Sequence, residues 1–323
     1  ALRASLCLYN RAMLRLSIDY RERVWGGQRL RPGAHPIGEA WIIHEGNRVV
    51  GGPYADRTLA DLSSALGAEL LGFVPLARTG NRFPLLIKIL DCQDWLSVQV
   101  HPNDAEAIRL EGPGHFGKTE AWNILEAAPG ARLIAGVKPG ITRAALAAAI
   151  QSGKVLDVAA SVDVAAGDTV MMPAGTLHAL GPGLLVYEVQ QSSDITYRVW
   201  DWDRPAAAGR SVHIAQSIAV TDPGMAPSLV RAMAARPGEA RELARCPYFV
   251  LESRVLGRNP VACDPLRESF HAVTAVEGQI EVSQAGQTTT LARFESVVIP
   301  AFAGPYLLRG APSGSVLTSR VAA

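Results

Sequence analysis

The sequence predicts a mainly β protein of two barrels, with a few helices inserted between strands. Short runs in which apolar and polar residues alternate recur along most of the chain, with Gly- and Pro-rich turns between them. Two stretches instead repeat leucine or alanine every three or four positions, as helices do, and lie at about 58–72 and 142–160. A length of 323 residues allows two domains.

Composition and charge narrow the classes of function. Hydrophobic residues make up 48% of the chain and charged residues 19%, which is typical of a compact folded protein. The formal net charge is +1 and no basic tract occurs, so we expect no nucleic-acid partner. These numbers do not exclude a small anionic ligand that a few residues recognise locally.

The cysteines and the first residues indicate a cytoplasmic protein. The four cysteines form neither a CxxC pair nor a dense disulfide framework, which favours a reducing compartment. Arginines at 3, 11 and 15 interrupt the apolar residues of 1–17, so this stretch lacks the continuous core of a signal peptide or spanning helix. We therefore expect a first structured segment there and no membrane partner.

The first half of the chain alternates strands with one helical stretch. Residues 41–46 are expected to form a strand that ends at a turn. The helical stretch from Leu59 to Leu71 has Thr58 or Asp61 as a capping residue. Residues 85–90 form a short apolar run of buried-strand length that leads toward the central strand.

The central strand is expected at 96–102. Neighbouring side chains on a strand face opposite sides, so Ser97, Gln99 and His101 share one face, and the two valines between them share the other. Pro102 ends the strand, and a turn with a helix cap is expected to follow. Three polar groups on one face indicate either an exposed edge or the wall of a polar cavity.

Two later stretches supply further polar groups and favour the cavity. Alternation in 117–122 places Lys118 and Glu120 on one face, and the Pro-Ala-Gly turn at 173–175 leads to His178 at the start of another apolar run. Two histidines, a carboxylate and an amide oxygen without thiolates suit zinc, and iron, manganese, nickel or cobalt are chemically possible. On spacing alone, the alternative is that Gln99 and His101 are ordinary surface residues of an edge strand.

A third polar stretch follows at 187–204. Glu188 and Gln190 share a face of one expected strand, and Arg198 lies ten residues beyond Glu188 on another. Arginine suits a carboxylate, a phosphate or a developing oxyanion. The alternative is a structural arginine paired with Asp201 or Asp203.

The last third repeats the strand pattern without the metal donors. Closely spaced strands with glycine turns are expected from Glu239 onward, and 223–237 forms the connection to them. When the sequence pattern of 167–178 is aligned with this part of the chain, Pro305 occupies the position that corresponds to His178. His271 is then a packed or exposed strand residue, and we expect a metal-free barrel at 233–323 after a metal-binding domain at 1–232.

The motifs named so far resemble those of a known family. Gly167, Pro173, Gly175 and His178 are similar to the second motif of the cupin superfamily, although Pro182 replaces the asparagine expected there. More specifically, the chain resembles type I mannose-6-phosphate isomerases of the shorter bacterial branch. The matching motifs are VWGGQRL (24–30), GEAW (38–41), LSVQVHPND (96–104), GKTEAW (117–122), PAGTLHALGPG (173–183) and YEVQQSSDITYRVWDWDR (187–204).

The resemblance implies a fold of two cupin-type jelly-roll barrels and assigns roles to the residues found by alternation. The family's zinc ligands fall on Gln99, His101, Glu120 and His178, with one zinc ion per chain expected. Its functional lysine and arginine fall on Lys118 and Arg198, its acidic cavity residue on Glu188, and a serine at the phosphate end on Ser97, with Lys118 as a second substrate contact. Longer relatives carry a histidine, implicated in opening of the sugar ring, where this chain has Gly117.

The implied reaction is the reversible isomerisation of mannose 6-phosphate and fructose 6-phosphate through a cis-enediol. Its partner is a phosphorylated hexose, and we expect a monomer or a weak homo-oligomer. Two other functions remain open: a metal-dependent cupin oxygenase, and a non-catalytic cupin that binds sugars. Metal content with oxygen consumption would identify the first, and failure of metal-replete protein to turn over any phosphosugar would favour the second.

Overall fold

The structure is a computed structural model that describes residues 12–205 and 210–323. Residues 1–11 of the expected first structured segment, with Cys7, lie outside the described residues. The described chain divides into two compact units. The terminal unit contains the described residues up to Asp19 together with Trp41–Lys88 and Met233–Ala323. The central unit contains Tyr20–Ala40 and Ile89–Ala232.

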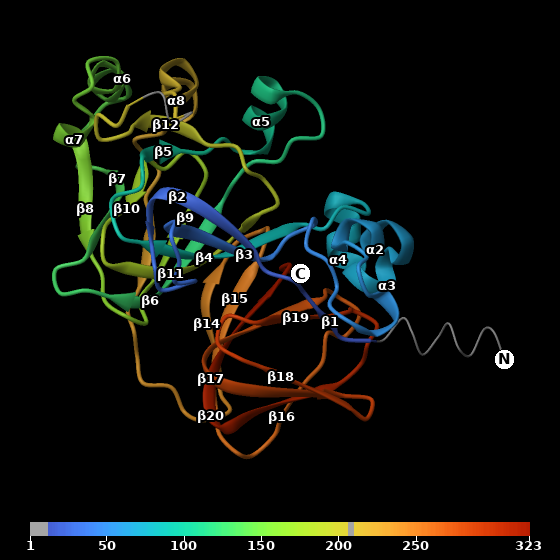
Figure 1. The fold of residues 1–323 in the computed structure, drawn as a ribbon. Coiled ribbons are helices and arrows are strands. Elements are labelled where there is room, and N and C mark those ends of the chain that lie inside the picture. Colours follow the sequence, from blue (N-terminus) through green and yellow to red (C-terminus); the bar gives the residue numbers. More distant parts are fainter. Residues whose placement is uncertain (1–11, 206–209) are drawn as a thin grey trace. The chain divides into compact units, whose positions relative to one another are not determined.

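The terminal unit is built on one antiparallel sheet, drawn mainly in orange and red in Figure 1. Its strand order is β1-β19-β17-β20-β15-β14, with β16 paired to β20 and β18 paired to β17. The inner face of the sheet carries aliphatic side chains that form one buried cluster. The strands are β1 (Leu14–Arg15), β14 (Ala240–Arg245), β15 (Val250–Leu256), β16 (Val261–Cys263), β17 (His271–Gln284), β18 (Gln287–Leu291), β19 (Ser296–Ile299) and β20 (Tyr306–Arg320).

Short helices fill the stretch predicted to be helical at 58–72. Thr58 caps the first of them in a capping box with Asp61, so both residues singled out in the sequence take part. The backbone N–H of Phe270 donates to the carbonyl oxygen of Leu71, which ties these helices to the sheet of the same unit. The stretch contains α2 (Leu59–Leu66) and α3 (Ala68–Leu71), while η1 (Gly52–Tyr54) precedes it and α4 (Phe73–Thr79) follows it.

The central unit contains two sheets. The smaller sheet has the order β12-β5-β10-β7-β8, and the larger has β13-β9-β6-β11-β4-β3-β2, of which β3 and β4 continue into the terminal unit. The strands of the smaller sheet are β5 (Val98–Val100), β7 (Arg132–Val137), β8 (Ala159–Asp163), β10 (His178–Leu180) and β12 (Tyr197–Trp200). The strands of the larger sheet are β2 (Asp19–Gly27), β3 (Ile37–Ile43), β4 (Leu85–Cys92), β6 (Glu120–Ala127), β9 (Thr169–Met172), β11 (Leu184–Gln191) and β13 (Ser228–Val230).

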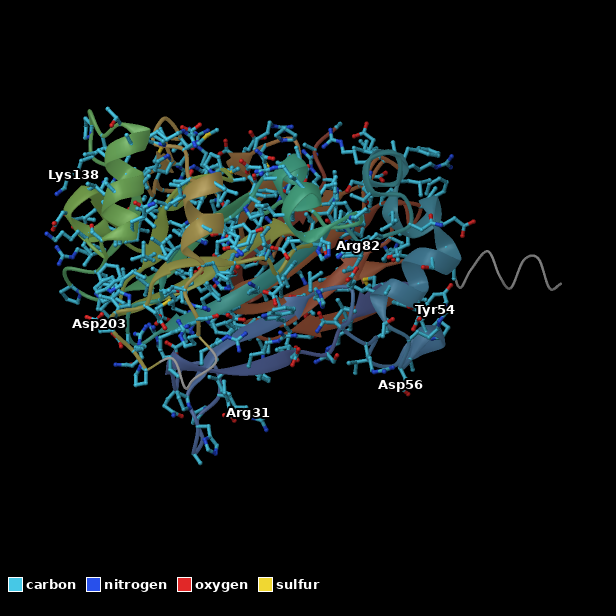
Figure 2. The ribbon with its side chains drawn as sticks, turned by 90° about the horizontal axis from the view of Figure 1, so that it is seen from above. Arg31, Tyr54, Asp56, Arg82, Lys138 and Asp203 are labelled. Carbon is cyan, nitrogen blue, oxygen red and sulfur yellow. The ribbon has the colours of Figure 1, made fainter. Side chains whose placement is uncertain are left out.

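Helices cover one face of the smaller sheet. These helices are α5 (Asp104–Glu111), α6 (Arg143–Gln151), α7 (Val155–Val158) and α8 (Ile214–Val220), and Figure 1 shows α6, α7 and α8 close together. Leu146 and Ile150 of α6 pack in one cluster with Val98 and Val100 of β5. Lys138, at the edge of this helical group in Figure 2, donates a hydrogen bond to the last turn of α7. The stretch expected to be helical at about 142–160 thus contains two helices, α6 and α7, which pack on this sheet.

The central strand has the predicted alternation. Val98 and Val100 pack under the helices, so Ser97, Gln99 and His101 face the other side, toward the space between the two sheets. A second cluster fills that space and joins side chains of both sheets, among them Leu133 and Trp122. The polar residues of β5 therefore line the interior of a β sandwich and not an exposed edge.

The domain boundaries differ from the expected ones at the amino-terminal side. Residues 12–19 and 41–88 were expected in the domain that precedes residue 233, and the structure places them in the terminal unit. The reason is backbone pairing: β1 pairs with β19, and Leu70 and Leu71 bond to the chain near β17 and β19. Within the described residues, no helix has the length and apolar character needed to cross a membrane. The three described cysteines are free thiols.

Candidate metal centre

Strand pairing in the central unit gathers the predicted polar residues. His101 directly follows β5 and His178 opens β10, and Gln99 of β5 stands opposite His178 in the antiparallel register. Glu120 opens β6 of the larger sheet. Ser97 is buried just before β5. The candidate donors therefore come from both sheets of one unit and face the space between them.

Three of the predicted ligands form a compact buried group. His101, Glu120 and His178 offer ligand atoms that all lie within 4.8 Å of one another. Nε2 of His178 is 3.3 Å from Oε1 of Glu120, and Nε2 of His101 is 3.6 Å from Oε2 of the same carboxylate. The three side chains are at most 1% exposed. Such a buried group of two imidazoles and a carboxylate could hold a metal ion.

Backbone carbonyl groups orient both imidazole rings. Nδ1 of His101 lies 2.9 Å from the carbonyl oxygen of Ile195, and Nδ1 of His178 lies 2.8 Å from that of Thr176. A carbonyl oxygen can only accept, so Nδ1 carries the proton in each ring and Nε2 keeps its lone pair. This arrangement is typical of histidines that bind a metal through Nε2. Each lone pair lies beside the Glu120 carboxylate.

Burial keeps His178 neutral. Removal of the ring from water lowers the pKa of His178 to about 3, and the ammonium of Lys118 acts in the same direction. Among the described residues, Nε2 of His178 has no hydrogen-bond partner. Burial of a nitrogen lone pair without a hydrogen-bond donor costs free energy, and a metal cation is a suitable partner for such a lone pair.

The turn before β10 requires Gly175. Its φ of 86° lies in the left-handed region, and its N–H donates to the carbonyl oxygen of His101 over 2.8 Å. A Cβ at this position would lie 3.2 Å from the carbonyl oxygen of Val220. The tight turn thus connects the segment before β10 to the end of β5, and both histidines depend on it.

Lys118 belongs to the same group of side chains. Its Nζ lies 2.9 Å from Oε2 of Glu120 and 3.0 Å from Nε2 of His101. The preceding Gly117 packs so closely that a Cβ there would lie 2.5 Å from the backbone of Asn103. A histidine at position 117 would therefore not fit this backbone.

Trp122 connects Glu188 to the centre. Glu188 and Trp122 are opposite each other in the register of β11 and β6, and Nε1 of Trp122 donates to Oε2 of Glu188 over 3.0 Å. The same indole ring packs edge-on against His178, with centroids 5.3 Å apart. The sequence had singled out Glu188 but assigned no role to this tryptophan.

Arg198 lies beside Gln99 in the next strand. The two residues are opposite each other in the register of β12 and β5, which places both side chains on the interior face. Nη1 of Arg198 donates to the carbonyl oxygen of Ser211, and its Nε is buried without a hydrogen-bond partner among the described residues. Burial, and then the charge of Arg210, lower the pKa of Arg198 from its ordinary value.

The alternative role considered for Arg198 was an ion pair with a nearby aspartate. Asp201 instead accepts from Arg210 at both carboxylate oxygens and from Arg204 at one of them. Within the described residues, Arg198 forms no ion pair with Asp201 or Asp203.

Some of the predicted residues contact one another directly, and others are only neighbours through strand pairing. His101, Glu120, His178 and Lys118 are in direct contact, whereas Gln99 and Arg198 are placed next to them by register. The carbonyl oxygens that orient the rings could not be identified from sequence patterns. The one that contacts His101 belongs to Ile195, which lies 94 residues later in the chain.

Fold and site together define a cupin-type β protein with a buried candidate metal centre, and comparisons with known proteins identify its family. Residues 13–121 match the family model for the catalytic domain of type I phosphomannose isomerase. The mannose-6-phosphate isomerase ManA of Bacillus subtilis is 32% identical over 307 residues, which cover 90% of this chain and 94% of that protein. The chain belongs to the type I mannose-6-phosphate isomerase family.

Further relatives and solved structures agree with this assignment. The mannose-6-phosphate isomerase of Streptococcus mutans is 39% identical over 249 residues, 73% of this chain and 76% of that protein. The crystal structure of the mannose 6-phosphate isomerase from Bacillus subtilis superposes with a TM-score of 0.80 at 27% identity, covering 96% of this chain and 99% of that one. A putative mannosephosphate isomerase from Archaeoglobus fulgidus shares the fold, with a TM-score of 0.74 at 20% identity over 96% and 97% of the two chains. The predicted cupin-type fold is confirmed.

Proposed function

We propose that this protein interconverts mannose 6-phosphate and fructose 6-phosphate at a site that uses one zinc ion per chain. The observation that carries the proposal is the buried group of His101, Glu120 and His178 with Lys118 against it, in a chain of this isomerase family. The reaction moves a carbonyl group between C1 and C2 of one sugar, so it needs no redox cofactor.

The donor set supports zinc. Two neutral imidazoles and a carboxylate are oriented toward one point, and Gln99, opposite His178, can add an amide oxygen as the fourth donor. Nitrogen and oxygen donors without thiolate suit zinc, and other divalent ions of the first transition row bind the same atoms. When bound, zinc would supply positive charge that stabilises the sugar oxygens at which negative charge develops.

Lys118 and Glu188 are the two groups placed to move the proton. In the open-chain sugar, the base takes the proton from C2, the C1 oxygen gains one to form a cis-enediol, and a proton then returns to C1 as the carbonyl forms at C2. Nζ of Lys118 lies 2.9 Å from Oε2 of Glu120, beside the position proposed for the zinc ion. Glu188 is buried and held by Trp122.

Arg198 and Ser97 complete the proposed contacts. Arg198 presents a permanent positive charge on the interior face beside Gln99, where it can stabilise the oxygen charge that develops during enolisation. Ser97 lies on the same face two residues before Gln99 and is buried, which suits a hydroxyl donor to the phosphate end of the sugar. Lys118 is the second group that can reach the substrate.

A coupled isomerase assay on protein of known metal content tests the activity. We expect zinc-loaded protein to convert each sugar phosphate into the other, chelator-stripped protein to be inactive, and added zinc to restore turnover. Absence of turnover in metal-replete protein would contradict the proposal, with phosphosugar binding then indicating a binding protein. Oxygen consumption in place of isomerisation would indicate an oxygenase.

Solvent-proton exchange separates the two proton-transfer candidates. In deuterated water, NMR of the product should show deuterium at C1 because a proton shuttle exchanges with solvent. Of the matched variants Lys118→Met and Glu188→Gln, the one that removes the base should lose both turnover and C2 exchange, typically by about 10²–10⁴-fold. Product free of solvent deuterium in the wild type would exclude the enediol route with an exchanging base.

A further inference from the structure

Gln190 lies on the interior face beside the candidate metal centre, and nothing described so far uses it. It stands directly opposite Glu120 in the register of β11 and β6, so the two side chains are neighbours on one face. Gln190 is also two residues from Glu188 on the same strand and therefore shares its face. Its side chain is fully buried.

The orientation of the Gln190 amide is determined by its surroundings. Nε2 donates to the carbonyl oxygens of Gln191 and Ser193. The opposite orientation would place Oε1 against these two carbonyl oxygens, both of which can only accept, so it is excluded. Oε1 is buried and has no hydrogen-bond partner among the described residues.

The neighbouring Gln191 shows what a purely structural glutamine looks like in this strand. Its Oε1 accepts from the backbone N–H of Thr119 over 2.9 Å, and its Nε2 donates to Oδ1 of Asp104 over 2.9 Å. Asp104 also accepts from the N–H of Gly117. Both ends of the Gln191 amide thus hold the segment that carries Lys118. In Gln190, by contrast, the amide oxygen has no hydrogen-bond partner among the described residues.

A buried acceptor without a donor is unfavourable, and such exceptions call for a ligand or a structural reason. We propose that Oε1 of Gln190 is a further binding group of this site and accepts a hydrogen bond from an O–H donor next to Glu120. The donor is either a hydroxyl of the bound sugar or a water molecule on the metal ion. The inference rests on the proposed function and adds to it a residue that recognises a hydroxyl.

Binding of unreactive sugar phosphates tests the inference. The probes are 1,5-anhydromannitol 6-phosphate, which cannot isomerise, and its 2-, 3- and 4-deoxy derivatives, titrated by calorimetry into zinc-loaded protein. Gln190→Met removes the acceptor and keeps a side chain of similar length. If a sugar hydroxyl is the donor, the parent compound should bind on the order of tenfold more weakly to the variant. This deficit should disappear for the one derivative that lacks the contacted hydroxyl.

Zinc affinity distinguishes the second source of the donor. If metal-bound water is the donor, Gln190→Met should lower the affinity for zinc in sugar-free protein and weaken all four sugar phosphates equally. In both cases the melting temperature without metal or ligand should also fall, because methionine removes the Nε2 donor to the carbonyl oxygens of Gln191 and Ser193. Gln191→Met is the matched control: it should lower that melting temperature and show no dependence on any one hydroxyl.

Two results would overturn the inference. One is Gln190→Met that binds zinc and all four compounds as the wild type does. The other is a Gln190→Met variant that loses stability as Gln191→Met does but keeps wild-type zinc affinity and shows no dependence on any one hydroxyl, because Gln190 would then be only an anchor. Gln190→Asn, which keeps both ends of the amide on a shorter side chain, serves if the methionine variant does not fold and should show the same dependence on zinc or on one hydroxyl. Wild-type turnover is measured separately, so failure here leaves the proposed function standing.

Discussion

The two units use the same strand-rich architecture, but their inner faces differ. In the central unit, β5, β6 and β10 direct paired polar groups into the space between the sheets. In the terminal unit, the corresponding space is filled by aliphatic side chains such as Val273, Val297 and Ile299. Where a strand–turn–strand in the central unit leads to His178, the terminal unit has Pro305, and its described residues contain no group of three metal-ligating side chains.

Polar side chains on the inner face of the central unit contact one another across strands. The carboxylate of Glu120 contacts Lys118, and Glu188 accepts from Trp122. In the terminal unit, His271 is held by the hydroxyl of Tyr306 over 2.9 Å, and burial lowers its pKa to about 4. The comparison teaches that the barrel itself is stabilised by apolar packing. A site arises only where several strands supply polar groups that satisfy one another or a ligand.

The largest expected effect comes from removing the nitrogen donors of the central unit. His101→Ala/His178→Ala should lose its metal and lower activity by more than about a hundredfold, since even outer partners of metal ligands often cost 10- to 100-fold. Elemental analysis and the isomerase assay measure both. His271→Ala in the terminal unit is the control and should keep its metal. Full stoichiometric metal in the double variant would contradict the site assignment.

Loss of Arg198 should give the next largest effect. Arg198→Ala should reduce kcat by on the order of 10²-fold, a few kcal/mol, because charge that develops in the transition state loses a donor. Metal content and melting temperature should change little, and Arg198→Lys should recover only part of the rate. Steady-state kinetics and thermal unfolding measure these quantities.

A second arginine of the central unit provides the control for this prediction. Arg231 pairs with Asp168 through its guanidinium. Arg231→Ala should therefore affect stability and leave kcat near the wild-type value. If Arg198→Ala behaved in the same way, with an unchanged kcat in the folded protein, Arg198 would have no part in the mechanism.

The smallest effect concerns pH and the terminal unit. The folded pKa of His271 is about 4 and its ordinary value is 6.5, so between these values the unfolded chain binds a proton that the folded chain does not. The contribution of this residue to stability is therefore present above pH 6.5 and is lost as the pH falls toward 4, by at most about 1.4 kcal/mol per pH unit. In His271→Gln, this part of the slope should vanish. Urea unfolding at pH 7, 6 and 5 compares the two proteins, and identical slopes would show that the imidazole is not held neutral.

The sequence by itself determined the local features of this protein. Alternation in 96–102 assigns Gln99 and His101 to one face, because the side-chain period of a strand is a property of its backbone. Thr58 marks the start of a helix, and its side chain accepts a hydrogen bond from the first turn as expected of a cap. The residue types alone also indicated nitrogen and oxygen donors, and hence the kind of metal ion.

Only the tertiary structure decided which groups meet. The pairing of β10 with β5 and of β6 with β11 determines that His178, His101 and Glu120 form one centre and that Gln190 lies beside it. The carbonyl oxygen of Ile195 orients His101, although no local pattern links positions so far apart. The placement of 41–88 in the terminal unit is likewise a matter of long-range pairing. A local sequence pattern encodes which face a side chain takes, whereas its partner across the sheet depends on how the whole chain folds.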